Sequence, residues 1–113
     1  MAGKTRELRV MLSADDPLGA AAEFYAQVLP IVVADQTNDL LLIFPPADHT
    51  HRAWRLAAVQ EIARSKAPLR VNAAASNDPA AIMAALAYLD GAAGVTGQYL
   101  PLADVAADSQ RAG

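Results

Sequence analysis

The chain has 113 residues, of which 54% are hydrophobic and 19% charged, and a formal net charge of −3. This length suits one compact domain with a buried core and is too short for two. The 9 basic and 12 acidic residues are scattered and form no basic patch, which argues against nucleic acid and anionic membranes as partners. No cysteine occurs, which excludes disulfides, thiolate chemistry and cysteine metal sites.

The start of the chain has no apolar core of the kind found in signal peptides. No apolar run reaches the ~18 residues that a membrane-spanning helix requires. We therefore expect a cytoplasmic protein that neither spans nor lies on a membrane.

The first half of the chain predicts a strand, a helix and a second strand. Residues Glu7 to Leu12 are typical of a strand, and Asp16 followed by Pro17 is a helix start, because aspartate caps the first turn and proline fits its first position. The helix is expected to run to about Val33, and a continuously apolar strand, Leu40 to Phe44, follows it. The apolar face expected for this helix is Leu18, Ala21, Ala22, Tyr25, Val28, Leu29 and Val32.

The second half repeats the alternation. A helix from about Thr50 to Lys66 is expected to carry Trp54, Ala57, Ala58, Glu61, Ile62 and Ser65 on one face. The remaining predicted elements are a strand from Leu69 to Ala74, a helix opened by Asp78 and Pro79 and running through Leu89, a left-handed Gly91 that ends it, a strand from Gly97 to Leu102, and a frayed tail, 104–113.

This order predicts an α/β fold, half of a Rossmann-like doubly wound sheet, with about four mainly parallel strands alternating with three helices. Successive right-handed connections would put all helices on one face of the sheet. We therefore expect the other face to be largely uncovered, with the short helix Pro79 to Leu89 covering only part of it.

From about Ala26 onward the chain resembles the C-terminal half of a short-chain dehydrogenase/reductase, of the kind that includes ketoacyl reductases. APLRVNA (Ala67 to Ala73) resembles the "RVNA" strand of that family, and ALAYLDGAAGVTGQYLPL (Ala85 to Leu102) resembles its last helix, turn and strand. NDLLLIFPP and AWRLAAVQEIARSKAP resemble the strand and helix that normally carry the catalytic residues. The resemblance implies one truncated domain of this family over residues 1–113.

The parts of the family that bind cofactor and perform chemistry are missing. A phosphate-binding turn needs a glycine-rich loop between a strand and a helix, whereas Gly91, Gly94 and Gly97 follow a helix and precede a strand. The resemblance places the catalytic serine near Phe44 and Pro45, the tyrosine near Pro46 and the lysine near Thr50. No Tyr-x-x-x-Lys occurs in the sequence, so we expect no catalytic and no cofactor-binding residues in this chain.

Three other features have a structural explanation beside a functional one. His49 and His51 in the DHTH segment could bind a metal, but adjacent loop positions without a fourth partner favour a solvated helix start. Trp54 could stack on a ligand, although its helical spacing favours packing or an interface. Asn72 matches a structural asparagine of the family, whose side chain needs a hydrogen-bonding partner. We expect no metal site.

The resemblance implies that the retained helices are those through which relatives oligomerise. We therefore expect a non-catalytic subunit that pairs with a full-length short-chain dehydrogenase/reductase in a pseudo-symmetric hetero-oligomer, in which the partner holds NADPH or NADH and reduces a β-ketoacyl thioester or similar carbonyl. A self-associating α/β binding or regulatory module is the alternative, and an independently active reductase is a third. The candidate interface residues are Tyr25, Val28, Trp54, Ala58, Ile62 and Tyr99.

Overall fold

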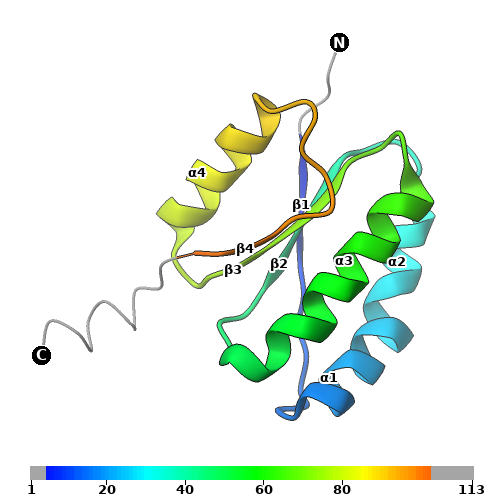
Figure 1. Ribbon diagram of the computed structural model, residues 1–113, viewed down its shortest axis with the longest axis vertical. Coiled ribbons are helices and arrows are strands. Elements are labelled where there is room, and N and C mark those ends of the chain that lie inside the picture. The colour runs from blue at the N-terminus through cyan, green and yellow to red at the C-terminus, as the bar shows by residue number, and fades with distance from the viewer. Residues whose placement is uncertain (1–4, 103–113) are drawn as a thin grey trace, which may run out of the picture.

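The structure is a computed structural model that describes residues 5–102 (Figure 1). The tail predicted to fray, 104–113, lies outside the described residues. The elements in chain order are β1 (Arg6–Arg9), α1 (Pro17–Glu23), the π-helical turn η1 (Phe24–Val28), α2 (Leu29–Ala34), β2 (Leu40–Phe44), the 3-10 turn η2 (His49–His51), α3 (Arg52–Lys66), β3 (Val71–Ala75), α4 (Pro79–Asp90) and β4 (Tyr99–Pro101).

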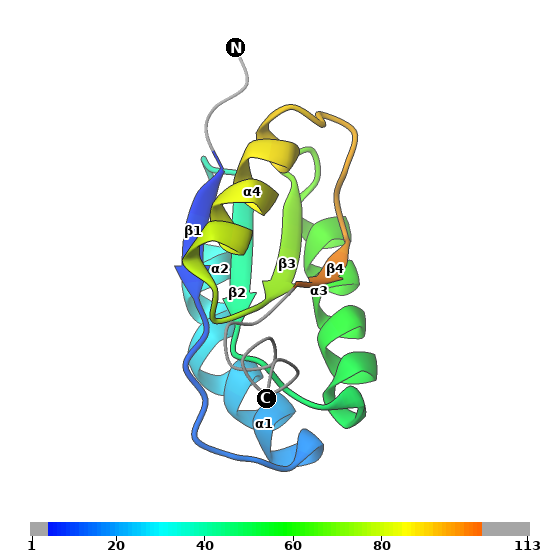
Figure 2. The ribbon, with the colours of Figure 1, turned by 90° about the vertical axis from the view of Figure 1, so that its left-hand side faces the viewer.

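The four strands form one parallel sheet in the order β1-β2-β3-β4. Arg6 pairs with Leu40, Leu40 with Val71, and Ala73 with Tyr99, so each strand lies beside the next one in the sequence. The predicted α/β class, with four parallel strands alternating with three helical segments, is confirmed. Because all strands are parallel, their carboxyl ends lie at the same end of the sheet (Figure 2).

Helices cover both faces of the sheet. The helical segment α1–η1–α2 and the helix α3 lie on one face, and α4 lies on the other (Figure 1). The connection from β3 to β4 therefore has the opposite hand to the first two connections, although right-handed connections are the rule. The prediction of a largely uncovered face is wrong, because α4 packs Ile82, Ala85 and Leu89 over Leu41, Ile43 and Ala74.

The larger core lies beneath α1–α2 and α3. The Phe24 ring lies 5.6 Å from the rings of Phe44 and Trp54, which joins the first helix, the second strand and α3. The buried members of this core are Val10, Phe24, Val28, Val32, Leu40, Leu42, Phe44, Ala58, Val59, Ile62, Ala63, Val71, Ala73 and Ala75.

The predicted helix faces are partly wrong. In the first helix the buried residues are spaced four apart, Ala20, Phe24, Val28 and Val32, whereas Leu18 is 83% exposed and Tyr25 43% exposed. The face of α3 is also rotated from the prediction: Ala57, Glu61 and Ser65 are exposed. The buried residues of α3 are Arg55, Ala58, Val59, Ile62 and Ala63.

The first helix, continuous from Pro17 to Ala34, is long and apolar enough to cross a membrane by length and composition. This finding differs from the expectation that no apolar run reaches that length. Phe24, Val28 and Val32 are buried against the sheet, so in this structure one face of the helix belongs to the domain core and the rest is exposed.

Arg70 connects the sheet to the end of α4. Its backbone N–H and its Nε donate to the two carboxylate oxygens of Asp39, at 2.8 and 3.0 Å. Its Nη1 donates to the carbonyl oxygens of Leu89 and Ala92, at 2.8 and 2.7 Å. The Leu89 carbonyl lies in the last turn of α4 and the Ala92 carbonyl just beyond it, where a cation is favoured because the negative end of the helix dipole lies there. Arg70 therefore holds α4 against the sheet.

Asn72 holds the turn between α4 and β4. Its Nδ2 donates to the carbonyl of Val95 at 3.0 Å, and its Oδ1 accepts from the backbone N–H of Gln98 at 3.0 Å. The prediction that this side chain has a structural partner is confirmed. Within the same turn Gly97 has a φ of 77°, a conformation that favours glycine. Gly91, by contrast, is right-handed at φ −91°, so its predicted left-handed cap is wrong.

Charged residues occupy the open edge of the sheet along β1. Arg6, Glu7 and Arg9 are exposed, and Arg6 also forms an ion pair with Asp35 at 2.7 Å. Charges on an edge strand disfavour pairing with a strand of another chain. This edge is therefore poorly suited to extension of the sheet.

We predict that Arg70→Lys lowers the free energy of unfolding by about 2 kcal/mol, because lysine cannot reproduce the bonds to Asp39 and to both carbonyls. Arg64→Lys is the matched control, since Arg64 makes an exposed pair with Glu61 and should change stability by less than about 0.5 kcal/mol. Urea unfolding measures both. Equal effects of the two substitutions would contradict the structural role of Arg70.

Candidate functional site

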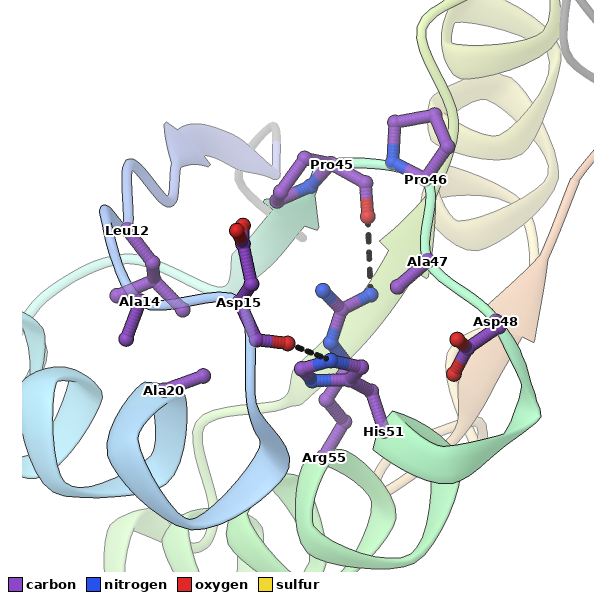
Figure 3. Close-up of a pocket in the computed structure, with 10 residues that line it drawn as sticks. All are labelled: Leu12, Ala14, Asp15, Ala20, Pro45, Pro46, Ala47, Asp48, His51 and Arg55. Carbon is purple, nitrogen blue, oxygen red and sulfur yellow. Dashed lines mark hydrogen bonds between the residues drawn. The ribbon is translucent and has the colours of Figure 1, made fainter.

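The candidate site is a pocket of about 350 Å³ beside the carboxyl ends of the strands (Figure 3). This end of a parallel sheet is where α/β proteins usually bind ligands. The loop from β1 to α1 forms one wall, and the loop from β2 to η2 forms another. The lining residues are Leu12, Ala14, Asp15, Ala20, Pro45, Pro46, Ala47, Asp48, His51 and Arg55.

Glu23 shapes the first wall of the pocket. Its carboxylate accepts hydrogen bonds from the backbone N–H groups of Ser13 and Ala14, at 2.7 and 3.0 Å, and from the Ser13 hydroxyl. These bonds, the backbone bond from Ser13 above all, hold the pKa of Glu23 below its ordinary value. The loop therefore stays attached to the helix while Glu23 is ionised.

His51 is held between two hydrogen-bonding partners. Its Nδ1 lies 3.1 Å from Nε1 of Trp54, which can only donate, so Nδ1 must accept. Its Nε2 lies 2.8 Å from the carbonyl oxygen of Asp15, which can only accept, so Nε2 must carry the proton. These bonds require the neutral Nε2–H tautomer and leave no free lone pair for a metal or for a substrate proton.

The DHTH segment forms the start of a helix. The Asp48 carboxylate caps η2 by accepting from the backbone N–H of Thr50 at 2.9 Å and from its hydroxyl. These bonds lower the pKa of Asp48. His49 is exposed, whereas His51 is buried. Within residues 5–102 no three His, Asp or Glu side chains gather as a metal site would require.

Arg55 forms the base of the pocket and is only 2% exposed. Its guanidinium lies over the Phe44 ring at 4.6 Å. Nη1 donates to the carbonyl of Pro45 at 2.9 Å and to the Tyr99 hydroxyl at 3.1 Å. Arg55 was not among the residues predicted from the sequence, although a signal existed: it stands three and seven residues before Ala58 and Ile62, on the buried face of the helix.

The structure separates the predicted interface residues into two groups. Val28 and Ala58 are buried in the core, so they offer no surface to a partner, and Ile62, 5% exposed, reaches only the floor of a groove. The exposed or half-buried members are Tyr25, Trp54 and Tyr99. Trp54 packs on Phe24 and Phe44, and Tyr99 lies 6.2 Å from Phe44, so both are also core residues.

A sequence model of the family described as "Short chain dehydrogenase-like protein" matches residues 8–102, most of the chain. This chain belongs to the short-chain dehydrogenase-like family. The match begins well before Ala26, where the resemblance was expected to start, and therefore includes the end of β1 and the whole first helix. No curated protein and no solved structure matches the chain.

Two prolines and a threonine stand near the positions where the family resemblance places the catalytic residues. Pro45 and Pro46, near the places expected for the serine and tyrosine, line the pocket wall, and Pro45 offers only its carbonyl to Arg55. Thr50, near the place expected for the lysine, donates to Asp48. These residues do not reproduce the chemistry of a hydroxyl–lysine pair.

The helix starts do not fit a nucleotide pyrophosphate either. Free N–H groups at a helix N-terminus are what a phosphate group requires. In the described residues Asp16 accepts from Gly19, Asp48 from Thr50, and Asp78 from Ala80, so an aspartate of the chain itself occupies the start of each helical segment that follows a strand. These carboxylates would also repel a pyrophosphate. The predicted capping roles of Asp16 and Asp78 are confirmed.

We predict that long-range ¹H–¹⁵N NMR spectra at neutral pH show His51 as the Nε2–H tautomer, because Trp54 donates to Nδ1. Trp54→Phe removes this donor and should allow the Nδ1–H tautomer to appear. His49, exposed and outside this arrangement, is the internal control and should not change. A wild-type His51 spectrum of the Nδ1–H form would contradict the arrangement.

Proposed function

We propose that this chain is a non-catalytic short-chain dehydrogenase-like subunit that pairs with a full-length relative in a hetero-oligomer and stabilises or modulates it. The partner would hold NADPH or NADH and reduce a β-ketoacyl thioester or similar carbonyl, in the cytoplasm. The observation that supports this proposal is where the large exposed apolar side chains lie on the surface. Six of them lie on the outer faces of helices: Leu18, Tyr25, Ile31, Val33, Met83 and Tyr88.

The first proposed docking surface is a groove between α1–α2 and α3. Tyr25, Leu29 and Val33 line one side, and Ile62 forms part of its floor. Glu61 and Lys66 stand on the opposite side, so the groove combines an apolar centre with a charged margin. This composition is typical of protein interfaces, in which an apolar centre is surrounded by polar residues.

The second proposed docking surface is the outer face of α4. Met83 is 70% exposed and Tyr88 56% exposed, and between them the face carries only small apolar side chains, Ala84 and Ala87. An aromatic and a methionine on an uncharged helix face are typical of contact surfaces. The family resemblance implies that the corresponding elements join subunits in complete relatives.

A second candidate function is a self-associating module without a redox role. The covering of both sheet faces by the chain's own helices favours it, because the chain needs no partner to complete its core. In that case the same apolar helix faces would meet in two copies of this chain. The two candidates differ in what binds, so the composition of the complex distinguishes them.

We predict that the chain, mixed with the complete short-chain dehydrogenase encoded nearest to it in its genome, elutes as a hetero-oligomer in size exclusion with light scattering. Tyr25→Glu and Tyr88→Glu should each weaken the complex at least about tenfold, because a charge is placed in an apolar contact. Gln60→Glu on the exposed side of α3, outside the groove lining, is the control and should change the affinity little. A complex containing only this chain would favour the self-associating module.

We also predict that NADPH fluorescence is unchanged by this chain alone and responds to the hetero-oligomer, because the capping aspartates occupy the helix starts. The chain alone should give no NADPH oxidation with a ketoacyl thioester. NADPH binding or hydride transfer by the purified chain would overturn the non-catalytic role.

A further inference from the structure

Arg55 is a buried cation that lacks an anionic partner. No carboxylate of residues 5–102 lies within ion-pairing distance of it, whereas Arg6, Arg64 and Arg70 all have one. The guanidinium lies over the Phe44 ring at 4.6 Å and 5.8 Å from the centre of the Trp54 ring. Ring faces and neutral oxygens offset only part of the cost of burying a charge.

The hydrogen-bonding capacity of Arg55 is only partly used. Nη1 makes both bonds, to Pro45 and Tyr99, while Nε is fully buried and donates to none of the residues that the structure describes. Nη2 donates to no described residue, and in Figure 3 the terminal nitrogen without a dashed line points between Asp15 and Pro45, toward the pocket. One charged donor therefore remains available to a molecule in the pocket.

The walls around this donor are mixed, with polar groups beside apolar side chains. Leu12, Ala14 and Ala20 line one side, and Pro46 and Ala47 line the other. The volume of about 350 Å³ is at the small end of ligand pockets, which run from about 300 to 1,000 Å³. His51 adds no donor, because its Nε2–H is bound to the carbonyl of Asp15.

We propose that this pocket binds a small organic monocarboxylate, with one carboxylate oxygen on Nη2 of Arg55 and an apolar body against Leu12, Ala20 and Pro46. A carboxylate would supply the charge that Arg55 lacks, in a bond strengthened by both charges. The proposal does not rest on the proposed function, since a subunit or a self-associating module could each hold such a ligand.

The charges at the pocket favour a single negative charge on the ligand. Asp15 and Asp48 both line the pocket, so an ion with two charges, such as phosphate, meets more repulsion than a monocarboxylate. Only Nη2 of the guanidinium is free and accessible, which suits a hydrogen bond to one carboxylate oxygen rather than bidentate binding of phosphate. Asp48 is occupied in its cap, whereas the Asp15 carboxylate accepts no hydrogen bond from the described residues.

The experiment is an NMR titration of the ¹⁵N-labelled full chain with 4-methylpentanoate, 4-methylpentanamide and inorganic phosphate. The amide has the same apolar body without the charge. We expect 4-methylpentanoate to shift the signals of Arg55 Nε–H and of the Leu12, Ala14 and Ala47 amides, and to bind at least about tenfold more tightly than either other probe. Equal binding of acid and amide, stronger binding of phosphate, or no shift at these residues would overturn the proposal.

Variants test the two parts of the site separately. Ala47→Phe fills the pocket from an exposed loop position and should abolish the shifts, without touching the buried Arg55, whose own replacement risks unfolding the chain. Asp15→Asn removes repulsion and should tighten 4-methylpentanoate binding several-fold. Glu7→Gln, the same loss of charge on β1, is the control and should leave the affinity unchanged. Unaltered binding in Ala47→Phe, or weaker binding in Asp15→Asn, would place the ligand elsewhere and refute the site.

Discussion

The arrangement of this domain depends on Arg70. Its backbone leads into β3, and its side chain binds Asp39, which precedes β2, and the carbonyls of Leu89 and Ala92 at and just beyond the end of α4. It thereby links the middle of the sheet to α4 on the second face. A charged residue that is 8% exposed is tolerated there because its partners are a carboxylate and two carbonyls near a helix C-terminus, where a cation is favoured.

The position of α4 determines what the fold requires from other molecules. Every residue of β2 and β3 is buried, and the smaller core beneath α4 accounts for the second face. Association is therefore not needed to cover the sheet, and the surfaces left for it are the groove beside Tyr25 and the outer face of α4. The chain thus combines a self-contained core with exposed apolar side chains on the outer faces of α1–α2 and α4.

The alternation of strands and helices could be predicted from the sequence because its signals are local. The continuously apolar Leu40 to Phe44 and the Asp-Pro pairs that start α1 and α4 need no knowledge of the partner elements. The helix faces could not be predicted so well, since alanine-rich helices are apolar nearly all round and Phe24 rather than Leu18 faces the sheet. The pocket was missed because Arg55 resembles a surface residue until Phe44, Pro45 and Tyr99, distant in sequence, enclose its guanidinium.

The charged β1 has a consequence for the behaviour of the protein at high concentration. An edge strand presents unpaired backbone donors and acceptors, which in an apolar strand can pair with a strand of another copy and template a ribbon. A copy added at β1 would crowd and partly desolvate the charged side chains of Arg6, Glu7 and Arg9, and this cost disfavours the addition. Replacing all three with valine would remove the cost and favour fibrous aggregates.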